Sequence, residues 1–240
     1  MKQNKIYIYG RHAVTEALKN APLAVRHAYF AKEMKDAGLR KLAAQSGIPI
    51  DVLDPRKVTS WVERNAPHQG VVALISLSGL LIPYEKWEPA GGAVVLLNEV
   101  QDPHNVGAVI RSAAALGASA VLMPQTNQSP VTGAVIKSSA GMAFTVPLVS
   151  ISNIQKTISE RKKKGFKVYG LTGEGKSSLA KEELNSNSVF IMGNEAAGLP
   201  KSTIQLCDSL LSIPIEAKAE SLNVAAAAAI TLYQWRTKNR

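Results

Sequence analysis

The 240-residue sequence predicts an α/β fold in two units, the second of which contains a parallel sheet. Short apolar segments alternate with longer amphipathic segments along the chain, which is typical of alternating strands and helices. Residues 78–92 contain prolines and three glycines that break this alternation, so we interpret them as a linker. The first apolar run after the linker, Val94–Leu97, is typical of a strand buried on both faces. The predicted units are therefore residues 1–77 and 93–240.

The first unit is expected to be a compact alternation of short strands and helices. Strands are expected at Ile6–Tyr9, Ala28–Ala31, Ile50–Leu53 and Val71–Ser76, and helices at Arg11–Asn20, Lys35–Ser46 and Pro55–Arg64. Gly47 ends the second of these helices, and Pro55 suits the first turn of the third.

The second unit repeats this alternation over a longer stretch. Its expected strands are Val94–Leu97, Ala120–Met123, Val146–Val149, Lys167–Gly170, Val189–Met192 and Leu210–Ile213, and its expected helices are Val106–Leu116, Ile154–Lys164 and Leu222–Trp235. We interpret the basic run Arg161–Lys164 as a solvated helix end. Ligands of such sheets bind beyond the carboxyl ends of the strands, so the loops after the strands are the candidate sites.

The basic composition favours a polyanionic partner. Lys and Arg exceed Asp and Glu by enough to give a net charge of +10, which indicates nucleic acid rather than a partner-free basic protein. The apolar share of 46% is enough for a core and argues against wholesale disorder.

The cysteine count, the histidine spacing and the hydropathy indicate which compartment and which kinds of site to expect. Cys207 is the only cysteine, which excludes an internal disulfide and a cysteine zinc cluster and fits a reducing compartment. The histidines lack metal-ligand spacing, so no metal is expected. The N-terminus has no signal core, and Leu222–Tyr233, the longest apolar stretch, is too short to span a membrane. A soluble, cytoplasmic protein with no membrane contact is expected.

Three loops rich in glycine, asparagine and charge follow strands of the second unit. They are Asn98–Gly107 with Arg111 one turn later, Gly193–Pro200, and Pro214–Asn223. Gly107 would let a helix start close to a ligand, and Arg111 would grip a phosphate with two hydrogen bonds. Gly193 would let the backbone approach a flat ligand such as adenine, and either Ser221 or Asn223 would cap the last helix. Each loop alone could be an ordinary turn, but three at one sheet edge favour a function.

A fourth segment matches the phosphate loop of nucleotide hydrolases. Gly170–Ser177 fits G-x-x-x-x-G-K-[ST] after a strand. However, Ser178–Leu184 is expected to be only a short polar helix, and the next strand, Val189–Met192, ends in glycine rather than a magnesium-binding aspartate. We therefore interpret the match as accidental.

The three loops resemble the three motifs of the SpoU (TrmH-like) RNA ribose methyltransferases in order and spacing. The matching residues are Asn105-x-Gly107-x-x-x-Arg111, Gly193-x-Glu195-x-x-Gly198, and Ile213-Pro214 followed by Ser221-Leu222-Asn223-Val224. The resemblance runs from about Val94 to Trp235. Tyr9–Val14 and His68–Ala73 resemble the start and end of the L30e-like substrate-binding domain that precedes this catalytic domain in the family. The combination is most similar to the branch that methylates a guanosine ribose in 23S ribosomal RNA.

This resemblance implies a SPOUT-type parallel sheet with a deep C-terminal trefoil knot, preceded by a small L30e-like RNA-binding domain. It also implies a homodimer with active sites at its interface, and S-adenosylmethionine as the methyl donor. Knots are nearly absent from proteins, so the pattern of residues does not itself predict one. Ala217 stands where the family usually has glycine, so the rim of the cofactor pocket is expected to differ there.

The resemblance also implies site residues. The catalytic set is Arg111, Asn105, Glu195, Ser221 and Asn223, and the cofactor-binding set is Thr172, Gly193, Ile213 and Leu222. The family proposal makes Arg111 a general base. A guanidinium hardly deprotonates, so we expect it to fix the RNA phosphate and stabilise the developing alkoxide.

The other catalytic residues are assigned supporting roles. Asn105 and Asn223 would orient the ribose or the arginine, and Glu195 would hold Arg111 or a backbone amide. Ser221 would either contact the ribose or cap the helix. Three alternatives stay open: a transfer RNA or another ribosomal site as substrate, a resistance-type ribosomal methyltransferase, and a non-catalytic RNA-binding assembly factor with this fold.

Overall fold

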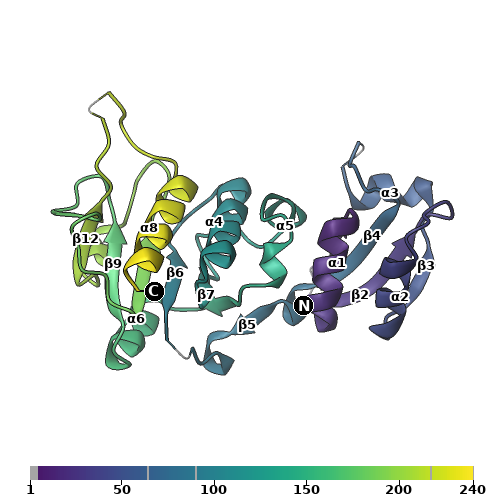
Figure 1. Cartoon of the computed structure of the whole chain (residues 1–240), viewed down its shortest axis with the longest axis horizontal. Helices are drawn as coiled ribbons and strands as arrows, with labels where there is room; N and C mark the ends of the chain where they lie inside the picture. The colour runs from purple at the N-terminus through teal and green to yellow at the C-terminus, as the bar shows by residue number, and fades with distance from the viewer. Residues whose placement is uncertain (1–4, 64, 90, 217, 240) are drawn as a thin grey trace.

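The computed structural model describes residues 5–63, 65–89, 91–216 and 218–239. They form two sheets, one of four strands in the order β1-β4-β2-β3 and one of eight in the order β10-β12-β9-β11-β6-β7-β8-β5. The two sheets follow one another along the long axis of the molecule (Figure 1). The predicted α/β class is confirmed.

The first sheet is mixed. Its strands are β1 (Lys5–Tyr9), β2 (Val25–Phe30), β3 (Ile50–Val52) and β4 (Val71–Ser76), and its helices are α1 (Arg11–Asn20), α2 (Ala37–Gln45) and α3 (Pro55–Trp61). β4 is antiparallel to β1 and β2, and β3 is parallel to β2. Alternate strand residues pack under α1 and α2 on one face, whereas Tyr7, Tyr9 and Tyr29 lie with Trp61 of α3 on the other.

The second sheet is parallel throughout. Its strands are β5 (Leu81–Pro83), β6 (Ala93–Leu97), β7 (Ala120–Pro124), β8 (Leu148–Ile151), β9 (Lys167–Leu171), β10 (Ser177–Ser178), β11 (Ser188–Met192) and β12 (Ser209–Ser212). β6 and β11, at its centre, are buried along their whole length, as the apolar run at 94–97 predicts.

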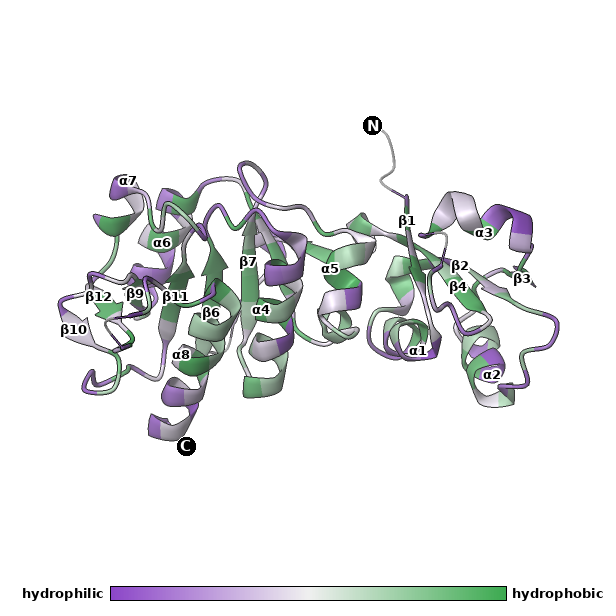
Figure 2. Ribbon diagram, turned by 90° about the horizontal axis from the view of Figure 1, so that it is seen from above, coloured by the Kyte–Doolittle hydropathy of each residue, from purple (hydrophilic) through white to green (hydrophobic). Residues whose placement is uncertain are grey.

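Helices cover both faces of this sheet. They are α4 (Pro103–Leu116), α5 (Gly133–Ser138), α6 (Ile154–Lys163), α7 (Lys201–Ile204) and α8 (Val224–Lys238). α4, α5 and α8 contribute to one core with Val95 and Phe190, whereas α6 and α7 pack on the other face with Val94 and Ile191 (Figure 2). Among the described residues, no helix is both long and apolar enough to cross a membrane.

Several boundaries differ from the sequence expectation for local reasons. α4 begins at Pro103, three residues early, because the Asp102 side chain accepts a hydrogen bond from the backbone N–H of His104. The third strand of the second unit is β8, displaced toward the C-terminus from 146–149. Ser178–Leu184 is not the expected polar helix, because Ser177–Ser178 pairs with β12 and turns follow. The short elements α5, α7 and β10 lack a periodic pattern long enough to predict.

The stretch 78–92, interpreted as a linker, is largely ordered against the second sheet. Leu81–Pro83 within it forms β5, the edge strand parallel to β8. Trp87 is buried, and Tyr84 Oη accepts a hydrogen bond of 2.9 Å from Nε of Arg161. The guanidinium of Arg161 lies 5.2 Å from the ring centroids of both Tyr84 and Trp87. The interpretation of this residue as part of a solvated helix end is wrong: Arg161 is 2% exposed, whereas Lys163 and Lys164 are exposed as expected.

Arg161→Ala is expected to destabilise the second unit. The substitution removes three cation–π contacts, to Tyr84, Trp87 and Phe166, and the apolar stem of a buried side chain, so the expected loss is about 2–3 kcal/mol in the free energy of unfolding. Urea unfolding followed by tryptophan fluorescence measures it. Lys163→Ala changes an exposed residue two positions further along the same helix. Its free energy of unfolding should lie within about 0.5 kcal/mol of the parent value. Equal stability of both variants would contradict this role for Arg161.

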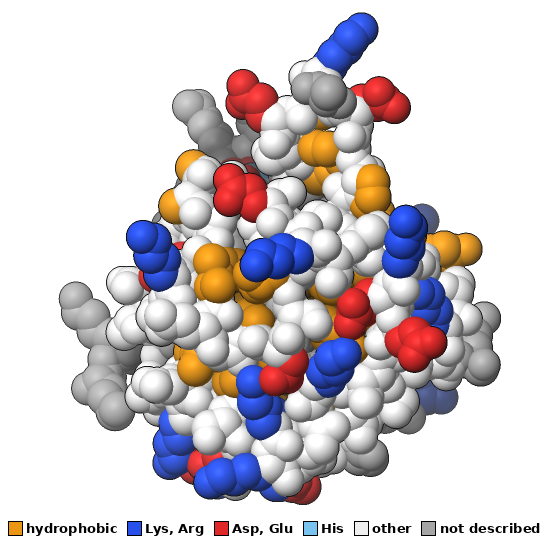
Figure 3. Space-filling model, turned by 90° about the vertical axis from the view of Figure 1, so that its left-hand side faces the viewer, with side chains coloured by type: hydrophobic (Ala, Val, Ile, Leu, Met, Phe, Trp, Pro, Cys, Tyr) orange, Lys and Arg blue, Asp and Glu red, His pale blue; other side chains and the backbone are white. Residues whose placement is uncertain are grey.

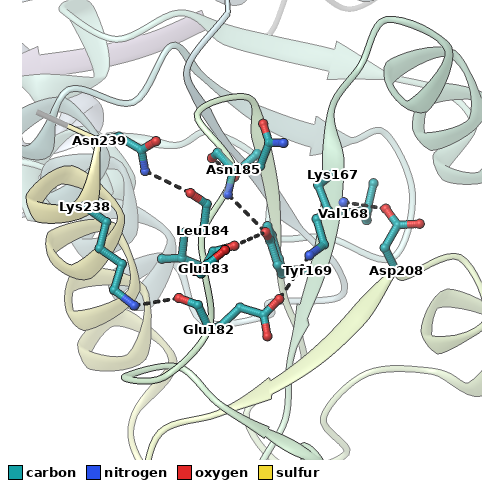
Figure 4. Close-up of polar contacts among 11 residues, drawn as sticks. Lys167, Val168, Tyr169, Glu182, Glu183, Leu184, Asn185, Asp208, Lys238 and Asn239 are labelled. Atoms are coloured by element: carbon teal, nitrogen blue, oxygen red, sulfur yellow. Dashed lines mark hydrogen bonds and ion pairs between the residues drawn. The ribbon is translucent and has the colours of Figure 1, made fainter.

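Hydrogen bonds join the end of α8 to the segment that precedes β11 (Figure 4). Lys238 Nζ donates to the carbonyl oxygen of Glu182 at 2.6 Å, and Asn239 Nδ2 donates to that of Leu184 at 3.2 Å. The buried Tyr169 of β9 accepts from the N–H of Asn185 at 3.1 Å and lies 3.3 Å from the carbonyl oxygen of Glu183. These bonds join the last helix to a strand far from it in sequence.

Cys207 is expected to react slowly with alkylating reagents. Burial raises the pKa of its thiol to about 11, so the reactive thiolate appears only at strongly alkaline pH. At pH 8 its thiolate fraction should be roughly 100-fold below that of an unfolded chain, since each pKa unit is a factor of ten. Mass spectrometry after iodoacetamide treatment, with and without urea, measures the difference. Equal labelling rates would contradict the burial of the thiol.

Candidate active site

The candidate loops converge because four of the strands that carry them are neighbours in the sheet. The order β12-β9-β11-β6 places the segments after Ser212, Leu171, Met192 and Leu97 at one edge. All these strands are parallel, so their carboxyl ends point the same way. The loop between β12 and α8 projects from this edge (Figure 1).

One hydrogen-bonded chain of side chains joins all three loops. Asn223 Nδ2 donates to Asn105 Oδ1 at 2.9 Å, and Asn105 Nδ2 donates to Glu195 Oε1 at 3.0 Å. The two bonded pairs are 118 and 90 positions apart in the sequence, so only the fold brings them together. Both hydrogen-bonding atoms of the Asn105 amide are used, so its orientation is fixed.

Asn223 caps α8, which settles the alternative between it and Ser221. Its Oδ1 accepts from the N–H groups of Ala225 and Ala226, at 2.9 and 3.4 Å. α8 therefore begins at Val224 rather than Leu222. Ser221 is exposed and makes no hydrogen bond to any described residue, which leaves its hydroxyl open to solvent at the site.

Glu195 holds backbone rather than Arg111. Its carboxylate accepts from the N–H groups of Gln101 and Asp102, both at 3.4 Å, in addition to the amide of Asn105. Of the two partners expected for it, the structure shows the backbone amides; among the described residues, no hydrogen bond joins it to Arg111. A carboxylate that accepts several N–H groups fixes the loop between β6 and α4.

Asn194, which falls at the unspecified position between Gly193 and Glu195 of the second motif, has a defined structural role. Its Nδ2 donates to the carbonyl oxygen of Glu99, and its Oδ1 accepts from the N–H groups of Ala196 and Ala197, all at 2.9 Å. It therefore closes its own loop and ties it to the loop after β6. The available signal was its place directly after a buried strand and Gly193.

Arg111 lies on α4, one turn beyond Gly107, with an exposed side chain. Within the part of the chain that the structure describes, its guanidinium has no hydrogen bond or ion pair, so its donors are available to a ligand. Gly107 was expected to let a ligand come close to the helix, but the structure shows a different use for it. It packs against α5, where an added Cβ would come within 1.8 Å of Ser138 Oγ and 2.6 Å of the carbonyl oxygen of Val135.

The residues assigned to the cofactor lie in the loops after β9, β11 and β12. Thr172 is half-buried and its N–H donates to the carbonyl oxygen of Leu211 at 3.0 Å. Gly193 is buried, and a Cβ there would come within 2.6 Å of the Gly198 carbonyl group. Ile213 is half-buried and Leu222 is 37% exposed. Ala217, whose departure from the family pattern was noted, lies outside the described residues.

This set fits an adenosyl group in chemical terms. The loops at this edge carry accessible apolar side chains, including Ile215 at 40% exposure, together with glycine backbone and a hydroxyl. Figure 3 shows hydrophobic side chains exposed among charged ones below a projecting loop on this end of the molecule.

The apparent phosphate loop is used to build the sheet edge. A Cβ at Gly175 would come within 2.5 Å of the backbone of Leu211, and Ser212 Oγ donates to the Gly175 carbonyl oxygen at 3.0 Å. Ser177, in β10, pairs with Leu211 of β12, and turns rather than a helix follow it. The loop therefore cannot wrap a triphosphate as a phosphate loop does.

Comparison with known families matches both halves of the chain. Residues 92–233 match the SpoU rRNA Methylase family, and residues 7–79 match the RNA 2'-O ribose methyltransferase substrate-binding family. The chain belongs to the SpoU rRNA methylase family. Its enzyme class, an S-adenosylmethionine-dependent RNA 2′-O-ribose methyltransferase, is therefore as the three loops indicated.

Relatives in the SpoU family are similar over nearly their whole length. The 23S rRNA (guanosine-2'-O-)-methyltransferase RlmB of Pseudomonas putida is 34% identical over 235 residues, which is 95% of this chain and 94% of that protein. The same enzyme of Xanthomonas axonopodis pv. citri is 35% identical over 241 residues, which is 97% of this chain and 96% of that protein.

Solved structures of SpoU-type enzymes share the fold. The methyltransferase AviRb of Streptomyces viridochromogenes, solved in complex with AdoMet, has a TM-score of 0.81 at 23% identity, covering 98% of this chain and 90% of its own. An AdoMet-bound rRNA methyltransferase of Sinorhizobium meliloti has a TM-score of 0.82 at 24% identity, covering 97% and 87%.

Proposed function

We propose that this SpoU enzyme methylates the ribose 2′-hydroxyl of a guanosine in 23S ribosomal RNA. The observation that carries the proposal is the bonded chain Asn223–Asn105–Glu195, which assembles the three family loops at one sheet edge; Arg111, with available donors, lies on the same helix as Asn105. The net charge of +10 suits an RNA substrate. The full-length relatives that act on 23S rRNA favour that RNA over transfer RNA. A ribosomal RNA substrate supports a cytoplasmic location for the enzyme, which is part of the proposal.

Thr172, Gly193, Ile213 and Leu222 are the residues that would hold S-adenosylmethionine. When bound there, the cofactor supplies an electrophilic methyl group. Gly193 and Gly198 keep the loop between β11 and α7 narrow, and the apolar side chains of Ile213 and Leu222 exclude water from an adenosyl group.

Arg111 binds the RNA phosphate next to the target ribose and stabilises the negative charge that develops on the 2′-oxygen as its proton leaves to solvent. Asn105 is held by Asn223 and Glu195, so it presents a fixed amide to the ribose or to the arginine. Ser221 contacts the ribose through its hydroxyl, since it does not cap α8. Glu195 is a positioning residue that keeps the β6–α4 loop in shape.

The domain boundaries and chain topology belong to the same proposal. Residues 1–77 form an L30e-like RNA-binding domain, residues 78–92 a linker docked by β5 and Trp87, and residues 93–240 a catalytic domain with a deep trefoil knot. The hydrogen bonds between the C-terminal helix region and residues 180–185 support this topology, because they hold the end of the chain against an earlier segment.

The enzyme acts as a homodimer in this proposal. Ile230 and Tyr233, one turn apart on α8, are 41% and 60% exposed, which suits a surface that a second copy covers near the site.

Calorimetric titration with S-adenosylmethionine, with ATP as the control, is the first test. Binding of the methyl donor alone is expected, and binding of ATP alone would overturn the proposal. Incubation with 23S rRNA, 16S rRNA and transfer RNA and a labelled methyl donor, followed by nucleoside mass spectrometry, then identifies the substrate. The expected product is 2′-O-methylguanosine in 23S rRNA; methylated transfer RNA would select the first alternative, and cofactor binding without any product would favour an assembly factor.

A further inference from the structure

A cleft of about 890 Å³ lies between the first sheet and the second unit, apart from the methyl-transfer site. Its walls come from β1, the end of α3 and the segment that leads into α5. α5 packs against β1 on one side and against α4 on the other (Figure 2). α5 therefore lies in contact both with a wall of the cleft and with the helix that carries Arg111.

Aromatic side chains form the wall on the side of the first unit. Tyr7 and Trp61 are stacked, with ring centroids 4.8 Å apart and planes 3° apart, and Tyr29 packs against Trp61 at 4.5 Å with its ring tilted by 42°. Tyr7, Tyr9 and Trp61 line the cleft and stay partly exposed. A rigid stack of this kind at a surface is suited to bind another flat ring.

Cationic groups stand at the same cleft. Lys5 is exposed in its wall, and Lys137 of α5 places its ammonium 5.6 Å from the centroid of the Tyr9 ring. Lys137 also lies 3.6 Å from the Glu63 carboxylate, but both groups are more than half exposed, so the pair contributes little and a phosphate can replace it. The Tyr9 hydroxyl is buried, and its interaction with Lys137 raises the pKa of that ammonium group, so the two side chains form one polar corner of the cleft.

We propose that this cleft binds an unpaired segment of the RNA substrate, with a nucleobase stacked on the Tyr7–Trp61 pair and a backbone phosphate beside Lys137 and Lys5. Sequence-specific readers of RNA take unstacked bases onto aromatic side chains in this way, and lysines supply the phosphate contact. Because α5 also touches α4, a strand held in the cleft continues toward Arg111. The cleft thus selects an RNA with a single-stranded region near the target ribose. This proposal rests on the proposed RNA methylation.

The test measures RNA affinity and methyl-donor affinity separately in the full-length protein. Trp61→Ala is expected to raise the Kd for an in vitro transcribed 23S rRNA fragment about 10-fold or more, which is the usual effect of losing one base stack. Trp61→Phe should recover most of the affinity, because it keeps a flat ring. The Kd for S-adenosylmethionine should stay within twofold of the parent in both, so failure of the methyltransferase assignment is seen as lost or absent donor binding and not as lost RNA stacking.

Lys137→Gln tests the cleft without removing an aromatic from the fold, and Lys156→Gln on α6, with a side chain 70% exposed, is its matched control. Lys137→Gln should weaken RNA binding and reduce its salt dependence, whereas Lys156→Gln should do neither. Photocrosslinking with RNA that contains 4-thiouridine should place the crosslink on the peptides of β1 or α3. Unchanged RNA affinity in Trp61→Ala and Lys137→Gln, or crosslinks confined to other peptides, would overturn the proposal.

Discussion

Arg111→Ala is expected to lower kcat for RNA methylation by about 100- to 1,000-fold or more, because it removes the cation proposed to stabilise the charge that develops on the 2′-oxygen. The side chain is exposed and bonds no described residue, so the fold should be unaffected. Transfer of a labelled methyl group to 23S rRNA measures kcat, and calorimetry measures donor binding. Donor affinity should stay within twofold of the parent.

Arg111→Lys serves as the matched control for charge. It keeps a cation but loses the planar fork that binds two phosphate oxygens, so its kcat should lie between those of Arg111→Ala and the parent. Full activity of Arg111→Ala would remove the residue from the mechanism. A variant that melts several degrees lower would instead assign Arg111 to the fold.

Gly107→Ala is expected to destabilise the protein by about 1–3 kcal/mol, since its methyl group would overlap Ser138 Oγ and the carbonyl oxygen of Val135. Alanine is otherwise the better helix former, so without the clash the change would stabilise α4 by about 1 kcal/mol. Thermal unfolding should show a lower Tm, and activity should fall because α4 carries both Asn105 and Arg111.

Two further variants separate the clash from other causes. Gly173→Ala, where nothing lies within 4 Å of the added Cβ, should melt within a degree or two of the parent. Ser138→Gly should recover part of the loss in the Gly107→Ala background, because it removes the nearer of the two contacts. A Gly107→Ala protein as stable as the parent would show that α5 moves aside freely.

The sequence predicted most elements because their signals are local. The strand at 94–97 and helix 11–20 follow from apolar runs, periodicity and flanking turn residues, and both lie where expected. Local reasoning failed for Arg161, because nothing in the run Arg161–Lys164 reports that Tyr84 and Trp87 lie against it. It failed in the same way for β5, whose pairing with β8 joins segments far apart in sequence.

For the candidate site too, local sequence signals predicted some features, and contacts between distant segments decided the others. The sequence by itself determined which loops carry the polar and glycine residues, and motif spacing singled out Asn105, Arg111, Glu195 and Asn223. Only the tertiary structure decided that Glu195 holds Asn105 rather than Arg111, that Asn223 and not Ser221 caps α8, and that Gly107 serves the contact of α4 with α5. The physical reason is that these bonds depend on the strand order β12-β9-β11-β6, which is set by packing across the whole sheet and leaves no periodic signal along the chain.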